Sequence, residues 1–326
     1  MSELCGIPLR GRFLLAPMAG VTDRAFRQVC REYGAALCCS EMVSARALIH
    51  HDEKTARLLP AADEGPCAVQ LFGSGADIMA EGARRALERC APALIDLNMG
   101  CPMPKIVDNG DGCALMERPE EAAAIVAAVK RVSPVPVTVK FRAGMDDAHR
   151  SAVEFARRLE AAGADALCVH GRTAAQRYAG TSDRAVIAAV RGAVSVPVLA
   201  SGDALSAAAC QAIFAETGAD FVMIARGALG NPMLFADCLA LDAGLPPPVH
   251  TAAEALAALT RQAERMCAEK GERRAIPELR KHGLWYLARL RGARPYKAEM
   301  SAVGTLAGLR SLCARMRDDE QIVWKG

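Results

Sequence analysis

One cysteine of this sequence stands where a thiol could do chemistry. Cys101 lies in the stretch IDLNMGCPMPK (residues 95–105), which begins as an apolar run and ends in a loop stiffened by prolines. An unperturbed thiol has a pKa of about 8.5, so near neutral pH it is mostly protonated and can deliver a proton. Nucleophilic catalysis is the alternative, and His170, the one histidine at the end of an apolar run, could then act as its base.

Other polar or small residues break the apolar runs at the same relative point, near the end of each run. The amide of Gln70 can donate and accept at the edge of a ring, and the ammonium of Lys140 can stabilise negative charge on that ring. Small residues after the last two runs let backbone N–H groups approach an anion, with Arg226 nearby. The residues near the ends of the apolar runs are Pro17, Met18, Ala19, Gln70, Asn98, Cys101, Lys140, Arg142, His170, Ser201, Gly202, Asp203, Ala225 and Arg226.

An anion subsite at one end and a redox-active ring at the other describe flavin mononucleotide (FMN) better than a sugar phosphate. The spacing of the residues alone does not decide this, because a phosphate pocket is common to many folds of the kind predicted next.

The apolar runs themselves predict the fold class. They are continuous rather than alternating, as expected of parallel strands covered on both faces. Helical spacing separates them, for example in residues 77–90 and 118–132. We expect an α/β fold, a (β/α)8 TIM barrel, with catalysis at the carboxyl ends of its strands. A doubly wound open sheet is the alternative, but GSGADI (73–78) lacks the third glycine of its fingerprint. The expected strands span 12–18, 36–42, 67–73, 93–99, 135–141, 166–171, 196–202 and 221–227.

A second region follows a run of three prolines in DAGLPPPVH (242–250). We predict a barrel domain over residues 1–245 and a small helical domain over 246–326. Residues 261–300 hold 11 Lys or Arg and 5 Asp or Glu, a net charge of +6 on a chain whose total is +3. This excess suggests contact with a polyanion, although a solvated helical face has the same composition.

The remaining composition excludes several classes of protein. No run of about 18 uncharged apolar residues predicts a membrane span, and the N-terminus lacks a signal pattern. The 13 cysteines form no C-x-x-C pair and mostly lie in apolar runs, which favours a reducing cytoplasm. His50-His51-Asp52-Glu53 has no partners at ligand spacing, so we predict no metal site.

The motifs together resemble one family, the tRNA-dihydrouridine synthases, and most closely its bacterial B-type branch. The resemblance spans nearly the whole chain, and NMGCP with HGRT is its most specific part. The matching stretches are APMAGVTDRAFR (16–27), SEMV (40–43), VQLFG (69–73), DLNMGCPMPKIVDNGDGCALM (96–116), VTVKFRAG (137–144), VHGRT (169–173), ARGALGNP (225–232) and RKHGLWYL (280–287).

The resemblance implies a concrete activity. Such enzymes reduce the C5–C6 double bond of specific uridines in tRNA with FMN and NADPH, hydride going to C6 and a proton from the loop cysteine, here Cys101, to C5. The FMN contacts implied are Pro17, Met18, Ala19, Gln70, Lys140, His170, Ser201, Gly202, Asp203, Ala225 and Arg226. Asn98 and Arg142 would address the target nucleotide, and Arg280 and Lys281 the tRNA backbone. No protein partner is implied, and we expect a monomer.

Two departures from the family pattern concern the cofactor. Relatives commonly carry Asn where this chain has Ser201, and a serine cannot offer both an amide donor and a carbonyl. Ala225 stands where relatives often have Gly, which tightens the approach to a phosphate.

Two rival functions remain open at this stage. A small-molecule pyrimidine reductase would use the same barrel, but it would not need the basic tail. A catalytically silent RNA-binding protein would not need Cys101, Lys140 and His170 together.

Overall fold

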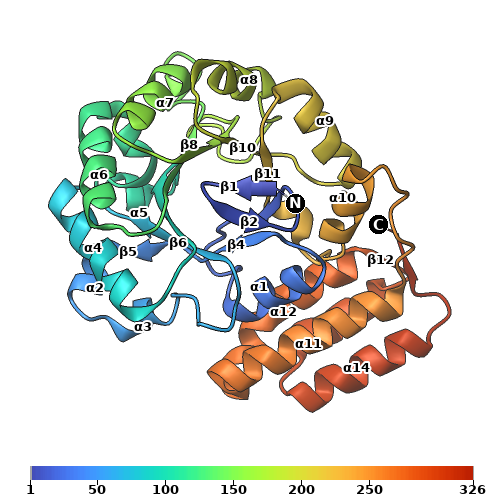
Figure 1. Cartoon of the computed structure of the whole chain (residues 1–326). Coiled ribbons are helices and arrows are strands. Elements are labelled where there is room, and N and C mark those ends of the chain that lie inside the picture. Colours follow the sequence, from blue (N-terminus) through green and yellow to red (C-terminus); the bar gives the residue numbers. More distant parts are fainter. Residues whose placement is uncertain (1, 326) are drawn as a thin grey trace.

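A closed barrel of eight parallel strands forms the centre of the computed structural model, which describes residues 2–325 (Figure 1). Pairing runs from β4 through β3, β11, β10, β9, β8 and β7 to β6, and β4 also pairs with β6, which closes the ring. The barrel strands are β3 (Phe13–Leu15), β4 (Leu37–Cys39), β6 (Cys67–Phe72), β7 (Leu94–Met99), β8 (Val137–Arg142), β9 (Ala166–His170), β10 (Val198–Ser201) and β11 (Phe221–Ile224). The predicted TIM barrel is confirmed.

Helices cover the outside of the barrel, as the continuous apolar strands require (Figure 1). Several are fixed at their ends by side chains or by glycine; for example, Asp23 caps the first helix by accepting from the Phe26 N–H, and Gly218 at φ 64° ends the ninth. These helices are α1 (Arg24–Glu32), α2 (Ala45–Ile49), α3 (Glu53–Ala56), α4 (Ala76–Arg89), α5 (Pro104–Val107), α6 (Pro119–Val132), α7 (Ala152–Ala161), α8 (Arg184–Ala193), α9 (Ala207–Thr217) and α10 (Leu234–Asp242).

A hairpin that the sequence did not predict plugs the amino-terminal end of the barrel. Strands β1 (Ser2–Leu4) and β2 (Ile7–Leu9) pair antiparallel, and Leu4 and Leu9 are buried against inward-facing barrel residues such as Leu14 and Phe221. The barrel is therefore filled from below, and its open end is the rim at the carboxyl ends of the strands.

The C-terminal region is helical, as predicted, and packs against one side of the barrel (Figure 1). Its apolar core includes Ala25 and Val29 of α1 and Met233, which precedes α10, so the barrel contributes to it directly. Tyr286 is fully buried there. The elements are α11 (Ala252–Lys270), α12 (Glu272–Ala288), α13 (Lys297–Ala302), α14 (Leu306–Asp318) and the small sheet of β12 (Leu290–Arg291) and β13 (Val323–Trp324). The outermost residues of the two predicted domains, Met1 and Gly326, lie outside the described residues.

Within residues 2–325, no helix combines the length and the apolar character that crossing a membrane would require.

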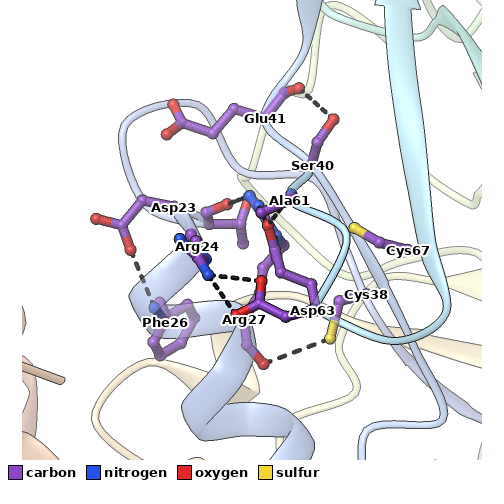
Figure 2. A network of polar contacts seen from close by, with 12 residues as sticks. Asp23, Arg24, Phe26, Arg27, Cys38, Ser40, Glu41, Ala61, Asp63 and Cys67 are labelled. Atoms are coloured by element: carbon purple, nitrogen blue, oxygen red, sulfur yellow. Dashed lines mark hydrogen bonds and ion pairs between the residues drawn. The ribbon is translucent and has the colours of Figure 1, made fainter. Parts of the chain in front are cut away.

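A buried ion pair joins α1 to the segment before β6. Arg27 donates from Nε and Nη2 to the two carboxylate oxygens of Glu64, both at 2.7 Å, and the two side chains are 3% and 2% exposed. Figure 2 shows the surrounding contacts, in which the neighbouring Arg24 is directed toward Asp63. The two pairs have the same chemistry, but that of Asp63 is at the surface, since its side chain is 65% exposed.

We expect Glu64→Gln to lower the free energy of unfolding by about 3–5 kcal/mol, because it leaves the Arg27 charge buried without a counter-ion. Asp63→Asn is the matched control, and we expect it to cost about 0–1 kcal/mol. Urea denaturation of the two variants measures both values. Equal losses would show that the Arg27–Glu64 pair contributes no more than a surface pair.

Candidate functional site

The predicted site residues of the barrel line a single cavity at its open rim. The cavity has a volume of about 470 Å³, within the usual range for small-molecule and cofactor sites. Every strand-end residue singled out in the sequence contributes to its wall. They are Pro17, Met18, Ala19, Gln70, Asn98, Cys101, Lys140, Arg142, His170, Ser201, Gly202, Asp203, Ala225 and Arg226.

Asn98 fixes the loop that carries Cys101. Its side-chain oxygen accepts from the N–H groups of Gly100 at 3.1 Å and Cys101 at 3.0 Å. Its Nδ2 donates to Oε1 of Gln70 at 2.8 Å, across the gap between β7 and β6. Two residues that the sequence assigned to different partners, the nucleotide and the cofactor, are therefore hydrogen-bonded to each other.

The thiol of Cys101 lies on the cavity wall and is partly buried. Burial raises its pKa above the ordinary value, against smaller lowering effects from the backbone at Met103 and the charges of Arg142 and Lys140. The thiol therefore stays protonated near neutral pH, which suits a proton donor rather than a nucleophile.

His170 is poorly suited to act as a base. It is 8% exposed, and burial, followed by the charges of Lys140 and Arg142, lowers its pKa to about 2. Its Nε2 faces Nη1 of Arg172 at 3.4 Å, so the neutral ring accepts there. The alternative in which His170 activates Cys101 as a nucleophile is thereby disfavoured.

The ammonium group of Lys140 faces the cavity without a protein counter-ion within residues 2–325. Within residues 2–325, no hydrogen bond or ion pair contacts its ammonium group, although it lines the cavity beside Asn98, its register partner on β7. An unpaired ammonium in a partly enclosed site fits a bound group that carries or develops negative charge.

Beside His170, an arginine cluster is organised by Asp203. The Asp203 carboxylate accepts from Nη2 of Arg172 at 2.8 Å, from Nη2 of Arg226 at 3.1 Å and from the N–H of Ser182 at 2.7 Å. Partial burial acts to raise its pKa, but the Ser182 N–H and the Arg172 guanidinium outweigh this and lower it. Its charge is thus compensated, and Arg226, whose side chain is 40% exposed, remains able to meet an anion.

Arg142 is largely committed to the backbone. Its Nε donates to the Gly100 carbonyl at 2.7 Å, and Nη1 donates to the carbonyls of Thr173 and Arg177. Only Nη2 lacks a protein partner within residues 2–325.

Tyr178 is a residue of the cavity rim that the sequence did not single out. It is 59% exposed, and its ring centroid lies 5.9 Å from the Arg142 guanidinium carbon and 5.4 Å from that of Arg226. It sits eight residues beyond the end of β9, so a search of strand ends misses it. An isolated aromatic residue in a polar loop of a chain with 4% aromatic residues is the signal that could have found it.

Arg280 and Lys281 lie on α12, outside this cavity. Nε of Arg280 donates to the Val303 carbonyl at 2.9 Å, whereas Nζ of Lys281 contacts the carbonyl of Gly20, in the loop whose neighbours Met18 and Ala19 line the cavity. The helical region therefore touches the rim loop directly. Lys281 also borders a second, charged cleft of about 270 Å³ between the two regions.

A family model described as dihydrouridine synthase matches residues 14–320. The chain belongs to the dihydrouridine synthase family. Its relatives in this family include tRNA-dihydrouridine synthase B of Pseudomonas aeruginosa, 39% identical over 95% of this chain and 92% of the relative. A probable tRNA-dihydrouridine synthase of Mycobacterium tuberculosis is 38% identical over 95% and 83% of the two chains. The predicted B-type branch is confirmed by this and other Pseudomonas relatives of that name.

Solved structures resemble this dihydrouridine synthase family member more distantly, and the resemblance concerns the barrel fold alone. A histamine dehydrogenase from Rhizobium sp. 4-9 aligns with a TM-score of 0.55 and 13% identity, over 78% of this chain and 49% of that one. The match therefore covers about half of the larger protein, and it supports the fold.

Proposed function

We propose that this protein reduces the C5–C6 double bond of specific uridines in tRNA to 5,6-dihydrouridine, with FMN as cofactor and NADPH as reductant. One observation carries the proposal. In a member of this family, one cavity is lined by the protonated thiol of Cys101, the unpaired ammonium of Lys140 and the hydrogen-bonded side-chain amides of Gln70 and Asn98. Family membership supplies the reaction class, and the cavity supplies the groups that this reaction needs.

The residues present fit a flavin mononucleotide. The unpaired Lys140 ammonium and the Gln70 amide suit the polar edge of the ring, where a reduced flavin carries negative charge. Arg226 and the backbone of the Ser201–Asp203 turn suit the phosphate, because the Asp203 charge is already compensated. Pro17, Met18, Ala19 and Ala225 provide small or apolar wall, and neutral His170 can pack against a ring without adding charge.

When bound, the flavin supplies the hydride for C6 of the uracil and is reduced again by NADPH. The chain's own part is to hold the target base and complete the reduction at C5. Cys101 delivers the proton from its Sγ to C5 and becomes a thiolate, which Arg142 and Lys140 stabilise by their charge. Two donors can orient the base or its phosphate: Nη2 of Arg142, and the second N–H of Asn98, whose present acceptor is the Met42 sulfur at 3.7 Å.

A uridine inside folded tRNA must leave its stack to enter a cavity at the barrel rim. The basic face of α12 would hold the RNA backbone while it does so. The reducing cytoplasm predicted from the sequence stays a prediction. The monomeric state stays a prediction.

The proposal is tested by NADPH oxidation and dihydrouridine analysis with unmodified tRNA, compared with free uracil and uridine. We expect reduction of the tRNA alone at low micromolar substrate. Reduction of only the free pyrimidines would instead identify a small-molecule reductase, and no reduction of any substrate would favour a non-catalytic RNA-binding role.

Reversing the charge of Arg280 and Lys281 is expected to weaken tRNA binding about tenfold or more and to flatten its dependence on salt, because two phosphate contacts are lost. Filter binding at several salt concentrations measures both effects. Arg131→Glu with Arg157→Glu is the matched control, since both residues are exposed on α6 and α7, away from the helical region (Figure 1). An unchanged salt slope in the Arg280 and Lys281 variant would contradict the assignment of α12 as the RNA-binding surface.

A further inference from the structure

A buried carboxylate beneath the cavity has no role in the reaction as described so far. Asp96 lies on β7, is 3% exposed and does not line the cavity. Its Oδ2 accepts from Nε2 of Gln70 and its Oδ1 from the hydroxyl of Thr138, both at 2.6 Å. Asp96 is therefore hydrogen-bonded to Gln70, a proposed contact of the flavin ring, without lining the cavity itself.

The bonds of Gln70 continue to the catalytic loop. Gln70 accepts from Asn98 at 2.8 Å, and Asn98 in turn accepts from the backbone N–H of Cys101 at 3.0 Å. Asp96, Gln70, Asn98 and the loop backbone thus form one chain of hydrogen bonds that crosses β7 and β6 beneath the cavity.

The two ends of this chain determine its direction. An ionised carboxylate can only accept, and a backbone N–H can only donate. Between them stand two amides, and each has one orientation in which every bond of the chain is made. If Gln70 were turned over, its NH2 would face the NH2 of Asn98. Asn98 would then have to turn as well and point its own NH2 at the N–H of Cys101.

We infer that Asp96 is a positioning residue that holds the Gln70 amide in the orientation read by the cofactor and, through Asn98, holds the Cys101 loop at the cavity wall. The inference rests on the proposed function for the identity of the bound ring and base. Its content is a property of the protein alone: whichever group stands at position 96 must present an acceptor to Gln70.

Thr138 gives this requirement a second part. Burial, against smaller effects of the Thr138 and Gln70 bonds, raises the pKa of Asp96 to about 6, so the carboxyl gains a proton in mildly acid solution. A proton on the Oδ1 side can be donated to the Thr138 hydroxyl, which also accepts. The Oδ2 side then still accepts from Gln70, and the chain keeps its direction. An asparagine at position 96 would behave in the same way.

A pair of isosteric substitutions tests this logic. Asp96→Asn can donate to Thr138, and Thr138→Val leaves an ionised Asp96 that still accepts from Gln70. At pH 8 we expect each single variant to lose less than about threefold in turnover, and the double variant at least about tenfold more than their product. In the double variant the NH2 group at position 96 has no acceptor except Gln70. Donation to Gln70 reverses the orientation of the Gln70 amide and, through it, that of the Asn98 amide.

The pH profile supplies a readout that a merely structural role would not change. In Thr138→Val, protonated Asp96 can donate only to Gln70, so we expect turnover to fall as the pH is lowered from 8, a fall absent from Asp96→Asn. The Thr138→Val variant lacks the Thr138 bond that lowers the pKa of Asp96, so the fall should be centred above pH 6. The other ionisable groups that face Asp96 are Lys140 and the thiols of Cys39 and Cys168. The two thiols are buried, which raises the pKa of Cys39 well above the ordinary value and that of Cys168 to about 12, so neither loses its proton in this range.

A third measurement needs neither tRNA nor turnover. Alkylation of Cys101 by iodoacetamide, followed by peptide mass spectrometry on the flavoprotein, should be at least about threefold faster in the double variant, because its loop is released. Buried Cys113 serves as the internal reference and should stay unlabelled, with an unchanged melting temperature. If wild-type protein forms no dihydrouridine, the proposed function fails, yet the alkylation result still decides the role of Asp96.

Several results would overturn the inference. The first is a double variant whose loss of turnover equals the product of the losses in the two single variants. The second is a Thr138→Val variant whose turnover does not fall at low pH. The third is alkylation of Cys101 in the double variant at the wild-type rate. A loss of turnover in step with the melting temperature, with Cys113 labelled as fast as Cys101, would show a structural role instead.

Discussion

Replacement of Cys101 by alanine is expected to lower dihydrouridine formation by about 10²–10⁴-fold, the usual contribution of a positioned general acid. Flavin content, flavin reduction by NADPH and tRNA affinity should stay at wild-type values, because within residues 2–325 the thiol makes no hydrogen bond beyond its own loop, where it contacts the backbone of Met103. Single-turnover reduction of unmodified tRNA, measured against the bleaching of the flavin, separates the two half-reactions.

Cys113→Ala is the matched control for this variant. Cys113 lies twelve residues further along, is buried and does not line the cavity. The Cys113→Ala variant should reduce tRNA at a rate within a few-fold of the wild-type rate. Wild-type rates in the Cys101 variant, or an equal loss in both variants, would contradict the role of Cys101 as proton donor.

The raised pKa of Cys101 also sets the pH dependence of this step. The thiol donates only while protonated, so turnover should hold through neutral pH and fall as the pH rises through the raised pKa, above the ordinary value for a thiol. The residual activity of Cys101→Ala should not show this fall.

Replacement of Lys140 by methionine is expected to slow flavin reduction by NADPH about a hundredfold, because the charge that develops on the ring loses the ammonium group that stabilises it. The effect should appear without tRNA, in stopped-flow bleaching of the flavin, and so differ from that of Cys101→Ala. Methionine keeps the length and the apolar stem of the side chain, so the barrel should fold normally.

Lys105→Met provides the comparison for Lys140. Lys105 is exposed on α5, in the segment that follows the Cys101 loop, but it does not line the cavity. It should reduce flavin at the wild-type rate. If Lys140→Met is reduced as fast as Lys105→Met, the ammonium does not stabilise the reduced ring.

The barrel was predictable because its signals are local. Continuous apolar runs such as 93–99 and 135–141 predicted β7 and β8 within two residues. The expected strand 36–42 was longer than β4, Leu37–Cys39, because the pairing with β6 is interrupted after Ser40 and resumes only at β5 (Val43–Ser44). The hairpin of residues 2–9 escaped prediction because three-residue strands give too short a pattern.

The positions of the site residues were predictable, but their partners were not. Strand-end placement brought fourteen residues to one cavity, since parallel strands end at one rim. Whether Asp203 faces a phosphate or Arg172, and whether Gln70 is free or bonded to Asn98, depends on side-chain directions that residue type does not encode. Asp96 was overlooked because one carboxylate inside an apolar run reads as part of the strand.

The stereochemistry of reduction tests the central claim most directly. Reduced protein equilibrated in D2O and mixed with unmodified tRNA for one turnover would place deuterium at both C5 and C6, and NMR of the released dihydrouridine would show on which faces. The family resemblance implies that the loop cysteine, here Cys101, stands across the base from the flavin, so we predict addition to opposite faces in the wild type. Addition of both deuterium atoms to the same face would contradict the account.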